Sequence, residues 1–138
     1  MAVFNKFQPF VEALAEKIHD LSTDQITLAL TNSANPPVAA NGVLADLTEI
    51  PYTNLSARDV TTNPSGQTGG IYKLELADLT LSASVGSVAP FQYVVLYNST
   101  AAAGNLIGFY DYGSELTLNA GESLLVDFDD ANGVLTIQ

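Results

Sequence analysis

The chain has 138 residues, of which 47% are hydrophobic and only 14% are charged, and four basic residues face fifteen acidic ones for a net charge of −11. This balance argues against binding to nucleic acid or to an anionic membrane, since both partners are recognised mainly through Lys and Arg. The length fits a single domain, residues 1–138, which can bury a core without a metal or a disulfide, and the sequence contains no Cys.

The low share of charge also indicates the kind of partner. Soluble domains usually have about 25% charged residues, whereas here Thr, Ser, Asn and Gln occupy most polar positions. Hydroxyls and amides cost less to desolvate than charges. The composition therefore favours a surface that becomes buried against other proteins.

An amphipathic helix is predicted within residues 1–22, because apolar residues recur there at alternating steps of three and four. Asn5 is the expected N-cap, Gln8 completes a capping box, and Pro9 falls in the first turn. The stripe is too short for a coiled coil, so we expect it to pack against the domain's own sheet. Its members are Phe4, Phe7, Val11, Leu14, Ile18 and Leu21.

Residues 25–31 alternate, with Ile26, Leu28 and Leu30 on one face, and predict a strand. Residues 33–70 then form an irregular arm rich in Pro, Gly and Asn, with one short helical turn expected within residues 44–50. Irregular stretches of this length are usually functional or disordered. Two alternatives stay open for residues 54–70: a free segment that orders only on a partner, or a segment buried in its own domain.

From residue 71 to 138 the pattern predicts a β-rich core. The apolar residues change from even to odd positions at Ala77 and Asp78, which indicates a bulge or a tight turn. Residues 91–97 are apolar on both faces, as is typical of a central strand. Residues 129–133 read as a hairpin loop between the last two strands. The predicted fold is mainly β, an antiparallel sandwich or jelly-roll-like domain with one N-terminal α-helix.

Little in the sequence points to chemistry. His19 is the only base of its type, but no nucleophile motif accompanies it, and a position near the helix end suggests a favourable interaction with the helix dipole. The acidic cluster at residues 127–132 departs from an EF-hand loop, because Ala131 replaces a ligand and Gly133 comes one residue late. We therefore expect no catalytic residue, no cofactor and no metal.

Several stretches resemble a family of small structural proteins from tailed-bacteriophage virions, of the capsid decoration or cement type. They are MAVFNKF (1–7), FVE (10–12), HDL (19–21), ITLALTN (26–32), VLADLTEI (43–50), YDYGS (110–114), LTLNAGE (116–122) and VDFD (126–129). The resemblance runs nearly end to end and is weakest over residues 54–70. It implies a non-enzymatic protein that sits outside the shell, binds the phage major capsid protein and strengthens the particle.

The same resemblance implies assembly in the host cytoplasm, a final place on the capsid exterior and a homo-oligomer there, without nucleic acid or membrane. Combined with the irregular arm, it predicts the capsid contacts Asn54, Arg58, Asn63, Pro64 and Gln67. A tail-associated structural protein is one alternative. A carbohydrate-binding attachment module, suggested by the cluster of Tyr side chains, is another.

Overall fold

The structure is a computed structural model that describes residues 2–138. Within that range it contains ten strands, one α-helix and one 3₁₀ helix. The helices are α1 (Pro9–Ala15) and η1 (Leu44–Asp46). The strands are β1 (Phe4–Lys6), β2 (Ile26–Thr31), β3 (Asp59–Val60), β4 (Gly66–Thr68), β5 (Ile71–Leu74), β6 (Leu79–Ser82), β7 (Phe91–Asn98), β8 (Leu106–Leu116), β9 (Ser123–Val126) and β10 (Leu135–Ile137).

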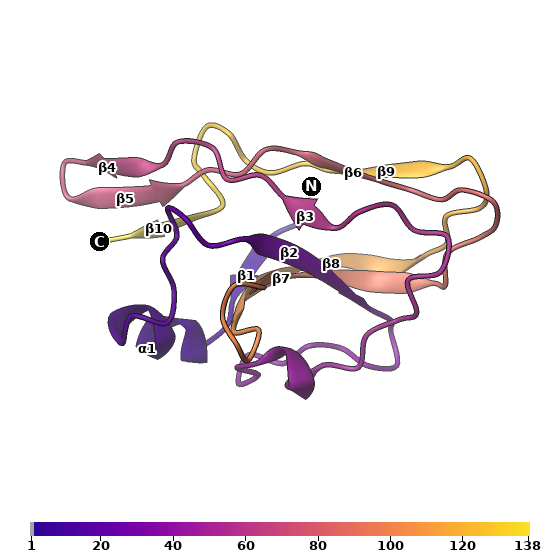
Figure 1. Cartoon of the computed structure of the whole chain (residues 1–138), viewed down its shortest axis with the longest axis horizontal. Coiled ribbons are helices and arrows are strands. Elements are labelled where there is room, and N and C mark those ends of the chain that lie inside the picture. The colour runs from indigo at the N-terminus through magenta and orange to yellow at the C-terminus, as the bar shows by residue number, and fades with distance from the viewer. Residues whose placement is uncertain (1) are drawn as a thin grey trace.

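The strands form two layers (Figure 1). One layer is a five-stranded antiparallel sheet in the order β1-β8-β7-β2-β3, and the other combines a three-stranded sheet, β10-β5-β4, with the pair β6-β9. The prediction of a mainly β, antiparallel fold with one α-helix is therefore confirmed. The strand order does not establish a jelly roll.

The predicted central strand, residues 91–97, lies in β7 at the middle of the larger sheet, beside β2, for which the sequence predicted an alternating strand. Every residue of β2 is buried, and β7 lies between β2 and β8 with antiparallel register to both. Leu28 and Val94 point into the core between the layers, whereas their neighbours Ala29 and Val95 point to the opposite side. A strand buried on both faces needs apolar residues at successive positions, which explains the continuous apolar run in β7.

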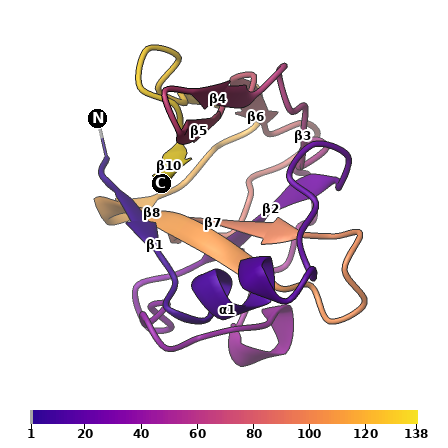
Figure 2. The ribbon, with the colours of Figure 1, turned by 90° about the vertical axis from the view of Figure 1, so that its left-hand side faces the viewer.

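A second, smaller core covers the outer face of the larger sheet. Phe7, Val95 and Leu106 are buried there, and Leu44 and Leu47 pack over them from the η1 segment. Figure 2 shows α1 and the η1 loop together below this sheet. The short helical turn expected within residues 44–50 is thus confirmed, and its role is to close this outer core.

The predicted N-terminal helix over residues 1–22 is wrong in its extent. Phe4 lies in β1, paired with Tyr110 of β8, and its ring occupies the space that a side chain at Gly108 would fill. The helix begins only at Pro9, with Gln8 rather than Asn5 at the N-cap, and it ends at Ala15. Edge pairing with β8 has overridden the helical periodicity of the first turn.

The loop over residues 129–133 is not a hairpin. The strand before it, β9, pairs with β6, whereas the strand after it, β10, pairs with β5. The loop therefore carries the chain from one part of the second layer to the other. Gly133 has a φ of 78°, and a side chain there would collide with Lys73 and the carbonyl of Leu74, which explains why glycine occupies this crossing.

The α-helix has seven residues, and across residues 2–138 no helix has the length and apolar character needed to cross a membrane.

Candidate interaction surface

Residues 54–70 are fastened to the sandwich, which favours the second of the two alternatives for this segment. Val60 of β3 pairs with Ile26 of β2 and is 3% exposed. Thr62 bridges to Leu76 of the second layer, and β4 pairs with β5 along its whole length. The segment thus crosses from the larger sheet to the smaller one and is held at each end.

Arg58 acts inside the domain rather than at its surface. Its guanidinium donates a hydrogen bond to the carbonyl oxygen of Leu28, and its Cζ lies 3.6 Å from the ring centroid of Tyr52. Glu49 Oε1 is 4.0 Å from Nη1 and accepts a hydrogen bond from the Tyr52 hydroxyl. Burial, reinforced by this bond, raises the pKa of Tyr52. Arg58 therefore joins β3 to the centre of the larger sheet.

Asn54 supports a turn on the second layer. It adopts a φ of 70°, and its side-chain nitrogen donates to the carbonyl of Ser87 at 3.1 Å. The backbone nitrogen of Ser84 donates to the Asn54 carbonyl at 3.0 Å. Between them, Val85 has a φ of 74° and is 99% exposed. Asn54 therefore holds a strained tip, and its own side chain is occupied.

The remaining predicted contacts gather at the β4–β5 hairpin. Pro64 and Gln67 are exposed and Asn63 is half-buried. The backbone nitrogen of Asn63 donates to the carbonyl of Glu75 at 2.9 Å, and Gln67 Oε1 accepts from the backbone nitrogen of Gly70 at 3.0 Å. We call residues 63–70 the hairpin face. The structure brings three of the five predicted contact residues together there and leaves Asn54 and Arg58 elsewhere.

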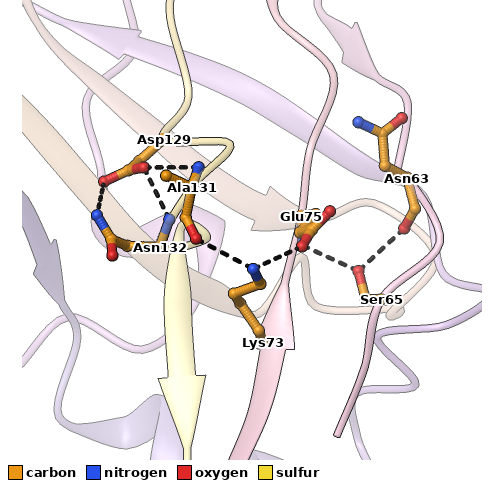
Figure 3. Close-up of polar contacts among 7 residues, drawn as sticks. All are labelled: Asn63, Ser65, Lys73, Glu75, Asp129, Ala131 and Asn132. Atoms are coloured by element: carbon orange, nitrogen blue, oxygen red, sulfur yellow. Dashed lines mark hydrogen bonds and ion pairs between the residues drawn. The ribbon is translucent and has the colours of Figure 1, made fainter. Parts of the chain in front are cut away.

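Lys73 ties the hairpin face to the crossing loop (Figure 3). Its Nζ donates to the carbonyl oxygen of Ala131 at 3.1 Å and lies 3.0 Å from Glu75 Oε1. On the other side, Ser65 Oγ accepts from the backbone nitrogen of Glu75 and donates to the carbonyl of Asn63, both at 2.9 Å. The hairpin is thus bonded across its own two sides and, through Lys73, to a loop 58 residues further along the chain.

The carboxylate of Asp129 accepts hydrogen bonds from within its own acidic loop. Asp129 Oδ1 accepts from the backbone nitrogens of Ala131 and Asn132 at 3.0 and 2.9 Å, and the Asn132 side chain donates to Oδ2 (Figure 3). These bonds, the Asn132 side chain first, lower the pKa of Asp129. Within residues 2–138 no three His, Asp or Glu side chains are grouped so that they could hold a metal ion.

His19 lies beyond the end of α1, so the predicted interaction with the helix dipole is wrong. It is 6% exposed, its ring centroid lies 5.1 Å from that of Phe10, and its Nδ1 is 3.1 Å from Nδ2 of Asn98. Burial lowers the pKa of His19, although the nearby Asp24 opposes the shift. A largely neutral, buried imidazole results.

Sequence reasoning missed this cluster because its partners lie far apart in the sequence. Asn98 stands at the end of β7, 79 residues from His19, and its Nδ2 also donates to Asp24 Oδ2 at 2.6 Å. Periodicity reports which face of an element a residue occupies and carries no signal for such a long-range polar pair. The described contacts of His19 are aromatic, amide and carboxylate groups, which suit a structural role.

Comparison with family models, with curated proteins and with solved structures finds no match to this chain.

Proposed function

We propose that this chain is a non-enzymatic structural protein of a tailed-phage virion, a capsid decoration protein that binds the major capsid protein from outside and strengthens the shell. The sequence resemblance motivates the proposal. The structural observation that supports the proposal is the hairpin face, an exposed and mostly uncharged surface that hydrogen bonds hold in place.

A rigid contact face suits this task because binding then loses little conformational entropy. Ordering a free segment costs roughly 1–2 kcal/mol per residue, whereas residues 63–70 are already held by the pairing of β4 with β5 and by the bond between Ser65 and Glu75. A surface that is organised before binding converts more of its contact energy into affinity. Weak single contacts are then sufficient, because many copies on one lattice act together.

The character of the face supports a protein partner. Between Asn63 and Gly70 there is no charged residue, and the side chains are amides, hydroxyls and one exposed Pro. Such groups are desolvated at lower cost than charges. The one nearby cation, Lys73, is already paired with Glu75, so the face presents main-chain and neutral polar groups.

The test uses the absence of cysteine from the sequence. A single cysteine is introduced by Gln67→Cys on the hairpin face, and another by Ala102→Cys in the exposed β7–β8 loop. Each variant is coupled to a polyethylene glycol maleimide and mixed with undecorated shells, and binding is measured by co-sedimentation. Wild-type protein in parallel with shells and with purified tails provides the reference.

We expect the wild type to sediment with shells and to raise the temperature at which they rupture. The polymer at residue 67 should abolish binding and the polymer at residue 102 should leave it intact. Equal binding of both conjugates would remove the hairpin face from the interface. A wild-type protein that ignored shells and bound tails would overturn the capsid assignment itself.

A further inference from the structure

A groove separates α1 from the edge strand β10. Two adjoining cavities form it, of about 620 and 300 Å³, and Leu14 and Ile137 line both. Its walls are mainly apolar, with Ile18 and Tyr72 at one end and Val11 at the other. Figure 2 faces this side of the molecule, with α1 below and the β10 strand above.

The β10 side of the groove is an open sheet edge. β10 is the last strand in the order β10-β5-β4. A two-residue turn, Gly69 and Gly70, joins β4 to β5, so the two residues that flank the turn form a hydrogen-bonded pair. The backbone groups of successive residues in β5 then point alternately toward β4 and toward β10. In β10, the backbone groups of residues 135 and 137 therefore pair with β5, and those of Thr136 point away from β5 and toward the groove. They are placed to pair with a further strand.

His19 lines one end of the groove, and its ring carries a buried donor without a partner. Asn98 Oδ1 accepts from the backbone nitrogens of Thr100 and Ala101, which fixes its amide so that Nδ2 faces His19 Nδ1. Nδ1 is then an acceptor, and the neutral imidazole carries its proton on Nε2. Nε2 is buried and has no hydrogen-bond partner in the described structure, which is unfavourable for a donor; because it is closed to solvent, it is not itself a contact for a ligand in the groove.

We propose that this groove binds an extended segment of the capsid shell protein, which adds to β10 as a further strand. The inference rests on the proposed function. The open edge of β10 supplies main-chain pairing, and the apolar walls take alternate side chains of the segment, as in β-strand addition.

Charge defines the segment further. Asp20 and Asp24 line the groove together with two basic residues, Lys17 and Lys6, so its own charges balance, whereas the whole chain carries a net charge of −11. An acidic segment or a free carboxylate would be repelled by that net charge. The complementary occupant is a neutral or basic segment with apolar side chains at alternate positions.

The first test compares two glutamate substitutions at exposed apolar residues. Ile18→Glu places a charge in the groove, and Val38→Glu places the same charge in a loop outside it; the two side chains are 45% and 54% exposed. Both variants should keep the wild-type melting temperature within a few degrees. Ile18→Glu should weaken binding to undecorated shells by about tenfold or more, and Val38→Glu should leave it unchanged.

The second test needs no variant. Amide hydrogen exchange of the wild-type chain, free and bound to shells, is followed by mass spectrometry. Strand addition predicts slower exchange at residues 134–138 on binding. If the wild type binds shells while exchange there is unchanged and Ile18→Glu binds normally, the groove inference fails and the proposed function stands. If the wild type does not bind shells, both fail. Protection that appears in concentrated free protein would assign the groove to a second copy and overturn the inference.

Discussion

Nδ2 of Asn98 donates a hydrogen bond to Nδ1 of His19 at 3.1 Å, and this bond joins the end of the central strand β7 to the turn that follows α1. Both side chains are almost fully buried, with exposed fractions of 1% and 6%. The pair therefore fixes the turn that forms one wall of the groove beside β10. It also gives the protein a polar cluster whose contribution to stability can be measured.

Replacing Asn98 should be costly. Asn98→Ala removes two acceptor bonds to backbone nitrogens, leaves His19 Nδ1 without a donor and takes from Asp24 one of its two donors, the other being the backbone nitrogen of Asp20. Each buried group left unpaired costs about 1–3 kcal/mol, so we expect the free energy of unfolding to fall by at least about 2 kcal/mol. Asn132→Ala, at an exposed position, should cost less than about 1 kcal/mol. Urea unfolding of both variants provides the comparison, and equal losses would contradict the role of Asn98.

Stability should fall as the pH drops from 6.5, the ordinary pKa of His. Burial lowers the pKa of His19 in the folded state, so between that lowered pKa and 6.5 the unfolded chain binds a proton that the folded chain does not. The slope is at most about 1.4 kcal/mol per pH unit. Since His19 is the only His, the His19→Gln variant should lack the slope just below pH 6.5. An unchanged slope in that variant would contradict this assignment.

Two glycines with similar backbones should respond differently to alanine. Gly133 and Gly113 have φ values of 78° and 81°, but a Cβ at Gly133 would meet Lys73 and the Leu74 carbonyl, whereas a Cβ at Gly113 meets nothing within 4 Å. Gly113→Ala should cost about 1 kcal/mol, from backbone strain alone. Gly133→Ala adds a collision and should cost clearly more, measured by thermal unfolding. Similar losses would show that the crossing loop shifts freely.

Arg58→Lys should not restore what Arg58→Ala loses. A planar guanidinium stacks on Tyr52 while it donates to Leu28, and an ammonium group cannot reproduce both contacts. A double-mutant cycle with Tyr52→Leu should give a coupling free energy of about 0.5–2 kcal/mol. A coupling near zero would mean that β3 is held by its backbone pairing alone.

The elements that sequence patterns predicted well are those buried on both faces. The strands β2 and β7 followed from continuous or alternating apolar runs, because each residue's hydrophobicity there reports directly on its position in the sheet. The helix was overextended, since Phe4 fits the helical stripe equally well and only its pairing with Tyr110 decides the matter. Periodicity cannot detect an edge strand that a distant partner selects.

The candidate contacts were predicted from the resemblance together with the irregular arm, and the structure places some of them at the surface and others inside the domain. Pro64 and Gln67 are exposed as expected of a contact segment, whereas Arg58 turns inward because Tyr52 and Glu49 form a site for its charge. Residues 129–133 do not join neighbouring strands, because β9 pairs with β6 rather than with the strand that follows it. Such long-range choices leave no local signal in a single sequence.

We propose that this domain occupies the outside of a phage capsid. Electron cryomicroscopy of the parent particle would locate it, because the two-layer domain should be recognisable in the density. We expect copies of this domain on the outer surface of the shell, with residues 63–70 against the capsid protein and a shell segment beside β10. Density for the domain in the tail, or a mature particle without it, would overturn the proposed function.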